Sequence, residues 1–186
     1  MTNTPPLVIL AGGQGLRMGG NKPLHPYDGG TLIGAVIARL EPQVRDMAIN
    51  AAEPGLSVFG LPLLYDEPAL ADLGPLSGIQ TALKWARTRG DTYVITAPCD
   101  MPRLPENLVS RLMAVPQEGA EVVYFAGSRD YPLCARWSVA ILPDLEDALR
   151  AAEGGLAVMR FLSGRRVVKL EAGDDGAFVN INAPES

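Results

Sequence analysis

Hydrophobic and polar positions along this chain follow two alternating patterns. Short apolar runs, such as residues 7–10 and 93–97, are typical of buried strands. Other segments space apolar residues three to four positions apart, as Leu32, Val36 and Leu40 do, which is typical of helices that pack on one face. The pattern therefore predicts strands and helices that follow one another along the chain.

Strands that alternate with helices of about ten to fifteen residues form βαβ units, and these build a mostly parallel sheet. We therefore expect an α/β fold. Strands are predicted at residues 7–10, 47–50, 61–65, 93–97, 121–125, 133–137 and 166–170, and helices at 32–40 (with Thr31 as N-cap), 77–89, 105–113 and 139–152. Residues 178–180 either close the sheet or form a loop beside it.

Composition restricts the class of protein. No repeat or linker divides the chain, so residues 1–186 are expected to form a single domain, and an apolar share of 47% is sufficient for a buried core. A net charge of −5 without a basic stripe argues against a nucleic-acid partner. The apolar runs are far shorter than the roughly 20 residues of a membrane-spanning helix, the start does not resemble a signal peptide, and the two cysteines have no metal-site spacing. We expect no membrane partner and a cytoplasmic location.

A glycine-rich segment directly follows the first predicted strand. Residues 12–20 contain five glycines, and Arg17 and Lys22 lie within or beside them. Glycines let backbone N–H groups approach a ligand, and together with fixed cations they form a polyphosphate-binding loop. A flexible surface loop is the alternative, but it does not explain why glycines and cations cluster after a strand. Phosphate binding is therefore predicted here.

This loop matches neither of the common phosphate-binding motifs. Gly15 and Gly20 have the spacing of a Walker loop, but Asn21 follows, and no hydroxyl residue comes after Lys22. A dinucleotide-binding loop requires a glycine where Met18 stands.

Asn50, Asp66 and Asp100 each follow a predicted strand, at the sheet edge where open α/β sheets bind ligands. Asp100 stands between Pro98 and Pro102, which restrict its backbone. A fixed carboxylate opposite a phosphate-binding loop suits Mg²⁺, which usually takes one or two carboxylates plus phosphate oxygens. A turn or helix-capping role is the alternative for Asp100, and Asp66 either contacts a ligand or caps the turn that follows it.

Five motifs occur in order along most of the chain. They are Leu10-Ala11-Gly12-Gly13 followed by Arg17-Met18-Gly19 and Lys22, then Gly74-Pro75-Leu76-Ser77-Gly78-Ile79, Pro98-Cys99-Asp100-Met101-Pro102, Arg129-Asp130-Tyr131-Pro132-Leu133, and Asn180-Ile181-Asn182-Ala183-Pro184-Glu185. Together they resemble the MobA-like nucleotidyltransferases, in the form found in molybdenum cofactor guanylyltransferases. Two positions depart from that pattern: Asn21 replaces the usual Asp, and Ala52 stands where the family commonly has Asn.

The resemblance implies a three-layer, Rossmann-like nucleotidyltransferase fold (GT-A-like) with a mostly parallel central sheet. It implies Mg²⁺-dependent transfer of GMP from GTP to the terminal phosphate of molybdenum-molybdopterin, giving molybdopterin guanine dinucleotide and pyrophosphate. The acceptor is already an anionic phosphate oxygen, so no general base is required, and positioning and electrostatics would provide most of the catalysis. Transient contacts with cofactor-delivery proteins and molybdoenzymes are also implied.

The resemblance assigns site residues. The catalytic residues are Arg17, Lys22 and Asp100, with Asp100 also the metal ligand. The nucleotide-binding residues are Leu10, Ala11, Gly12, Gly13, Gly15, Lys22, Asn50, Asp66, Gly78 and Asp100. Asn180 and Asn182 are assigned to the pterin substrate or the metal, and a hydrogen-bonded C-terminal turn is the alternative for them.

Other interpretations stay open. Related cytidylyltransferases typically have alanine where Gly12 stands, and glycine there leaves room for a purine. Sugar-phosphate nucleotidyltransferases share the opening loop but are generally longer, and a non-catalytic nucleotide-binding paralogue would keep the fold. Cys99 is interpreted as a small buried residue rather than a nucleophile, and Trp137 as a candidate for lining the cleft.

Overall fold

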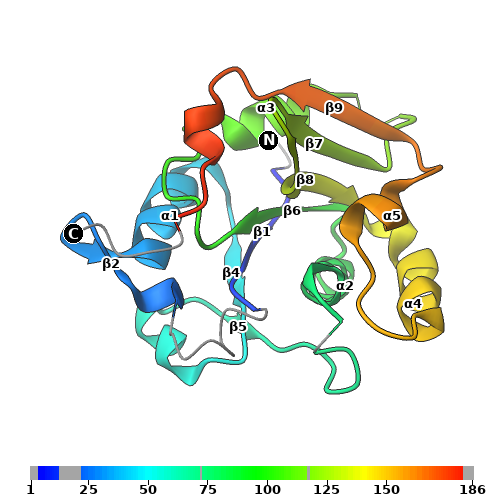
Figure 1. The fold of residues 1–186 in the computed structure, drawn as a ribbon, viewed down its shortest axis with the longest axis horizontal. Coiled ribbons are helices and arrows are strands. Elements are labelled where there is room, and N and C mark those ends of the chain that lie inside the picture. Colours follow the sequence, from blue (N-terminus) through cyan, green and yellow to red (C-terminus); the bar gives the residue numbers. More distant parts are fainter. Residues whose placement is uncertain (1–3, 13–21, 72, 117, 182–186) are drawn as a thin grey trace.

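The central feature of the fold is one sheet of seven strands in the order β5-β4-β1-β6-β8-β7-β9 (Figure 1). The computed structural model describes residues 4–12, 22–71, 73–116 and 118–181. Strand bounds are β1 Leu7–Leu10, β4 Met47–Asn50, β5 Leu63–Leu64, β6 Tyr93–Pro98, β7 Val122–Ala126, β8 Asp130–Ser138 and β9 Val167–Glu171. β8 runs antiparallel to β6 and β7, and the other neighbouring pairs are parallel, which confirms the mostly parallel α/β sheet.

Helices cover both faces of this sheet. Their bounds are α1 Leu32–Leu40, α2 Pro75–Thr88, α3 Leu108–Ala114, α4 Leu142–Ala151 and α5 Val158–Leu162. A separate two-stranded hairpin, β2 Pro26–Tyr27 and β3 Gly30–Thr31, precedes α1. None of the helices in the described part of the chain combines the length and apolar character needed to cross a bilayer.

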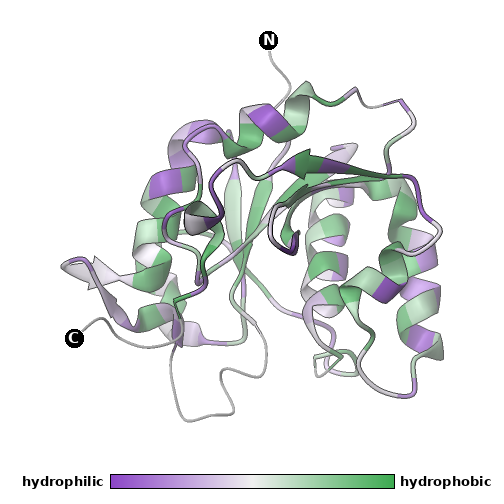
Figure 2. Ribbon diagram, turned by 45° about the horizontal axis from the view of Figure 1, so that its top comes forward, coloured by the Kyte–Doolittle hydropathy of each residue, from purple (hydrophilic) through white to green (hydrophobic). Residues whose placement is uncertain are grey.

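The sheet has a hydrophobic core on each face, and successive side chains of β1 point alternately into the one and the other. Leu7 and Ile9 pack into the core that α1 and α3 cover, whereas Val8 and Leu10 pack into the core on the side of α2, α4 and α5. All four side chains are buried, because a strand covered by helices on both faces has no solvent side. Figure 2 shows the central strands coloured as hydrophobic, while hydrophilic residues lie on the outward faces of the helices. The expected three-layer arrangement is therefore confirmed.

Several element boundaries differ from those predicted. The third helix starts at Leu108 rather than at residue 105, because Gln43 competes for the backbone groups of the first turn. Its Nε2 donates to Pro105 O at 3.1 Å, and its Oε1 accepts from Val109 N at 3.0 Å. The fourth helix starts at Leu142, after a short 3-10 turn. Asp175–Phe178 forms another 3-10 turn, and no strand follows it as far as residue 181.

Candidate active site

The carboxyl ends of β1, β4, β5 and β6 open onto a pocket of about 470 Å³. Every predicted site residue within the described part of the chain lines it, namely Leu10, Ala11, Gly12, Lys22, Asn50, Asp66, Gly78, Asp100 and Asn180. Gly13, Gly15, Arg17 and Asn182, which were also predicted, lie outside the described residues. The structure therefore brings together residues that are up to 170 positions apart in the sequence, from Leu10 to Asn180.

Lys22 and Asp100 form an ion pair in this pocket. Lys22 Nζ donates to Asp100 Oδ2 at 2.6 Å, and the two side chains are only 24% and 14% exposed, so water screens the pair less than it screens a surface salt bridge. Asp100 lies two residues after the end of β6, and Cys99 N donates to Leu10 O at 3.1 Å, which holds this loop against the end of β1. The sheet thus fixes the backbone that carries the carboxylate.

Two oxygen atoms beside this ion pair have unused hydrogen-bonding capacity. Asp100 Oδ1 and Asn180 Oδ1 are buried, and neither has a hydrogen-bond partner among the described residues. Ile181 N donates to Asp100 O at 2.8 Å, so the C-terminal segment lies against the Asp100 loop. Buried oxygens without partners are costly unless a ligand satisfies them, and hard oxygen donors suit Mg²⁺ or a similar divalent cation. The residues present therefore fit a metal ion.

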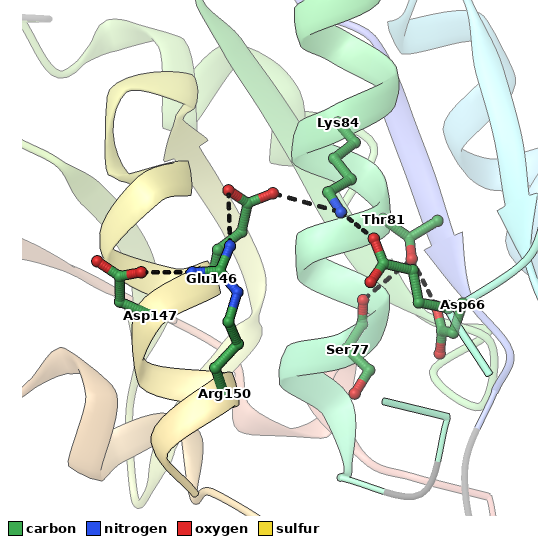
Figure 3. A network of polar contacts seen from close by, with 8 residues as sticks. Asp66, Ser77, Thr81, Lys84, Glu146, Asp147 and Arg150 are labelled. Carbon is green, nitrogen blue, oxygen red and sulfur yellow. Dashed lines mark hydrogen bonds and ion pairs between the residues drawn. The ribbon is translucent and has the colours of Figure 1, made fainter. Parts of the chain in front are cut away.

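A second polar cluster orients Asn50 (Figure 3 shows its Asp66 and Thr81 members). Asn50 Nδ2 donates to Asp66 Oδ1 at 2.7 Å and to Leu64 O at 3.2 Å. Both partners are acceptors, so the amide nitrogen must face them. Asn50 Oδ1 consequently points the other way, and a Cβ added at Gly78 would lie 2.4 Å from it. The cluster therefore presents a hydrogen-bond acceptor beside Gly78.

Sequence reasoning missed Thr81. Its Oγ1 donates to Asp66 Oδ1 at 2.7 Å, the same oxygen that accepts from Asn50 Nδ2. Figure 3 shows the side chains of Asp66 and Thr81 next to each other. One helical turn further along α2, Lys84 pairs with Glu67 and with Glu146 of α4, at 3.3 Å from Glu146 Oε1. Thr81 could not be recognised as a site residue from the sequence, because only the fold places it beside Asp66.

The burial of Cys99 and Trp137 bears on two expectations. Cys99 is 8% exposed, and burial raises the pKa of its thiol to about 12, so it is a packed residue and not a nucleophile. The interpretation of Trp137 as a cleft residue is wrong. Its side chain is completely buried in β8, where its Nε1 donates to Thr96 Oγ1 at 2.8 Å. Alternation along β8 directs Trp137 into the core beneath α2 and α4.

Cys99 and Cys134 both line the pocket, and their reactivity tests how tightly this part of the pocket is packed. Burial raises the pKa of both Cys99 and Cys134, so almost no thiolate forms at pH 8. We expect the folded protein to resist iodoacetamide at pH 8 and both cysteines to react after denaturation, as mass spectrometry would measure. Alkylation of Cys99 in the folded protein within minutes would contradict this packing.

The sheet topology, with a lysine–aspartate pair at its carboxyl edge, agrees with the nucleotidyltransferase class of enzymes, to which the family match assigns this chain. Residues 7–169 match the family model described as "MobA-like NTP transferase domain", and the chain belongs to this family. Proteins named "Molybdenum cofactor guanylyltransferase" are 41% identical in Cereibacter sphaeroides, covering 96% of this chain and 91% of that protein. In Rhizobium meliloti (strain 1021) the identity is 38%, with 97% and 88% covered.

Solved structures show the same fold. Molybdopterin-guanine dinucleotide biosynthesis protein A from Archaeoglobus fulgidus superposes with a TM-score of 0.76 at 21% identity, covering 96% of this chain and 93% of that one. A Mycobacterium tuberculosis protein in complex with manganese gives a TM-score of 0.65 at 17% identity, covering 91% and 88%. Both identities are too low to carry more than the fold.

Proposed function

We propose that this chain transfers GMP from GTP to the terminal phosphate of molybdenum-molybdopterin, giving molybdopterin guanine dinucleotide and pyrophosphate. Relatives at 38–41% identity over nearly the whole chain are named for guanylyl transfer to the molybdenum cofactor. The observation that carries the proposal is the Lys22–Asp100 pair with the unpartnered Asp100 Oδ1 beside it, at the edge of the sheet where a nucleotide enters.

The nucleotide is held by residues from two sides of the ion pair. Lys22 neutralises triphosphate oxygens, and the backbone of Leu10, Ala11 and Gly12 lines the approach to them. Asn50 Oδ1 accepts a hydrogen bond from a donor of the nucleoside, and Asp66 keeps the amide in that orientation. An alanine at position 12 would place its Cβ 3.6 Å from Asn50 Oδ1, the acceptor that we propose for the nucleoside, and Gly12 leaves this side of the pocket free, which favours the guanylyl over the cytidylyl assignment.

A divalent cation, which we propose to be Mg²⁺, is held by Asp100 with Asn180 beside it. When bound, this ion supplies positive charge to the phosphate oxygens as the α-phosphate reacts. Lys22 supports Asp100 and is placed to stabilise the leaving pyrophosphate. Gly13, Gly15 and Arg17 are included among the phosphate-binding residues, and Asn182 on the acceptor side, from the sequence motifs alone.

The reaction needs no general base. The acceptor phosphate oxygen forms a bond to the α-phosphorus, and the bond from that phosphorus to the bridging oxygen breaks, so that pyrophosphate carries away the charge. The acceptor phosphate is already ionised at neutral pH, so it can attack without first losing a proton. The protein's task is therefore to bring two anions together and to fix them in line.

Pyrophosphate release tests this function. We expect release from GTP only when Mg²⁺ and molybdenum-molybdopterin are both supplied, and little release from CTP or ATP. Preference for CTP would move the assignment to cytidylyl transfer. Folded protein that is inactive with every nucleotide, or that is active with a sugar phosphate in place of the pterin, would contradict the proposal.

A further inference from the structure

The turn between β7 and β8 forms a wall of the pocket that the nucleotide assignment leaves unused. Arg129 lines the pocket from this turn, and Asp130 and Tyr131 line it from the start of β8. In the sheet order, β7 and β8 lie on one side of β6, whereas β4 and β5 lie on the other. Asn50 is the last residue of β4, and Asp66 follows β5. Asp100 at the end of β6 therefore stands between a wall assigned to the nucleotide and a wall with no assigned ligand.

Charge singles out Arg129 on this second wall. Among the described residues that line the pocket, the cations are Lys22 and Arg129. Lys22 pairs with Asp100, whereas the Arg129 guanidinium lies over the Tyr131 ring at 5.4 Å, and no ion pair joins it to a carboxylate of the described residues. Asp175 lies within electrostatic range of Arg129 but forms no ion pair with it among the described residues. A guanidinium at the rim of a pocket, stacked on a tyrosine ring and not held by an ion pair, is well suited to bind a phosphate through two hydrogen bonds.

Asp175 fixes the turn that carries Arg129. Asp175 Oδ2 accepts from Ser128 N at 2.9 Å, and Asp175 Oδ1 accepts from Tyr131 OH at 2.7 Å. These contacts hold the residue before Arg129 and a residue shortly after it. Gly127 N also donates to Arg129 O at 2.9 Å, which closes the turn. The carboxylate packs so tightly that a Cβ at Gly127 would lie 2.0 Å from Asp175 Oδ1.

The segment that supplies Asp175 also supplies the oxygen donor beside the metal site. Phe178 stacks on Tyr131 with ring centroids 4.8 Å apart, and Asn180 follows two residues later. The 3-10 turn at Asp175–Phe178 thus links the β7–β8 turn to the loop of Asp100. An acceptor bound at Arg129 would therefore lie on the same side of the pocket as Asn180.

Resting on the proposed function, we propose that Arg129 binds the terminal phosphate of the acceptor and that Asp175 is a positioning residue, which holds the β7–β8 turn so that Arg129 faces the pocket. Each of the two reacting anions then has its own cation, Lys22 for the triphosphate and Arg129 for the acceptor phosphate. Bringing two anions together is the main electrostatic barrier to this reaction, so a separate cation on the acceptor side lowers it.

Steady-state kinetics with Arg129→Met tests whether Arg129 binds the acceptor phosphate. We expect the KM for molybdenum-molybdopterin to rise about 10- to 100-fold, as for a lost charge-assisted pair of hydrogen bonds, while the KM for GTP changes less than about twofold. The matched control is Arg87→Met, which removes an exposed arginine of α2 outside the pocket and should leave both values unchanged. An unchanged acceptor KM, or an equal rise in the KM for GTP, would overturn the assignment.

Double-mutant kinetics tests whether Asp175 positions Arg129. Asp175→Asn and the milder Tyr131→Phe should each raise the acceptor KM selectively, by about 3- to 10-fold, with circular dichroism confirming the fold. Added to Arg129→Met, Asp175→Asn should have almost no further effect; a full multiplicative effect would show that Asp175 does not act through Arg129. Wild-type protein without activity would overturn the proposed function and this inference with it, whereas active wild-type protein with unaffected variants would overturn this inference alone.

Discussion

Replacing Asp100 with asparagine should lower GTP-dependent pyrophosphate release by roughly 1,000-fold or more. The substitution removes the negative charge that we propose to hold the divalent cation, and a catalytic metal ion contributes several kcal/mol to stabilisation of the transition state. The amide keeps the shape of the carboxylate and still offers an oxygen to Lys22, which lies 2.6 Å from Asp100 Oδ2. Because the pair is largely buried, we expect folding stability to fall by about 1–3 kcal/mol, with the protein still folded.

Metal binding provides the second readout for Asp100→Asn. Isothermal titration of Mn²⁺ in the presence of GTP should show binding to the wild-type protein and at least a tenfold loss of affinity in the variant. Asp147→Asn is a suitable control, because it removes an exposed carboxylate whose one ion pair among the described residues is with Arg150. If the variant kept both Mn²⁺ affinity and activity, Asp100 would not be the metal ligand.

Gly78→Ala should weaken GTP binding by about tenfold or more and destabilise the protein. A glycine-to-alanine change within a helix normally stabilises by about 0.5–1 kcal/mol. At this position the new Cβ would lie 2.4 Å from Asn50 Oδ1 and 3.2 Å from Leu10 Cδ2. Asn50 cannot turn away without breaking its hydrogen bonds to Asp66 and Leu64, so an overpacking cost of about 1–3 kcal/mol outweighs the helical gain.

Thermal unfolding and equilibrium GTP binding would measure both effects. Arg87→Ala, on the exposed face of the same helix, controls for helix propensity and should leave GTP binding unchanged. In the double variant with Asn50→Ala the clash is absent, and the stability cost of Gly78→Ala should largely disappear. A Gly78→Ala protein that is more stable than wild type and binds GTP normally would show that the Asn50 amide is not fixed as described.

The sequence predicted that Asn50, Asp66 and Asp100 lie at one edge of the sheet because that information is local. Asn50 ends one apolar run and Asp100 lies two residues beyond another, both runs could be recognised as buried strands, and parallel strands bring their carboxyl ends to one edge. Thr31 was equally readable as an N-cap, and its Oγ1 does accept from Gly34 N at 3.2 Å. In these cases the residue type and its immediate neighbours determine the structure.

Features that depend on distant partners were not predictable. The start of α3 depends on Gln43, and the orientation of Asn50 depends on Asp66 and Thr81 from two other elements. Arg136 is a clear example, since a charged residue in an apolar strand reads as an exposed position. It is 1% exposed, and its Nη1 donates to Leu112 O at 3.0 Å and Val115 O at 2.8 Å at the end of α3. Only the packed structure shows these acceptors.

In the described part of the central sheet, β8 is the one strand that runs antiparallel to its neighbours, and this has a consequence for how the site can diversify. Because β8 runs against β6, its first residues arrive at the edge where β6 ends, and the turn before it can change length without moving Asp100. The parallel strands that carry Asn50 and Asp100 have no such freedom, since each is joined to the next by a packed helix or a long crossover. Insertions in residues 127–129 would thus reshape one wall of the pocket while the opposite wall kept its geometry. The specificity that we propose for the acceptor could then change in evolution without changing the specificity for the nucleotide.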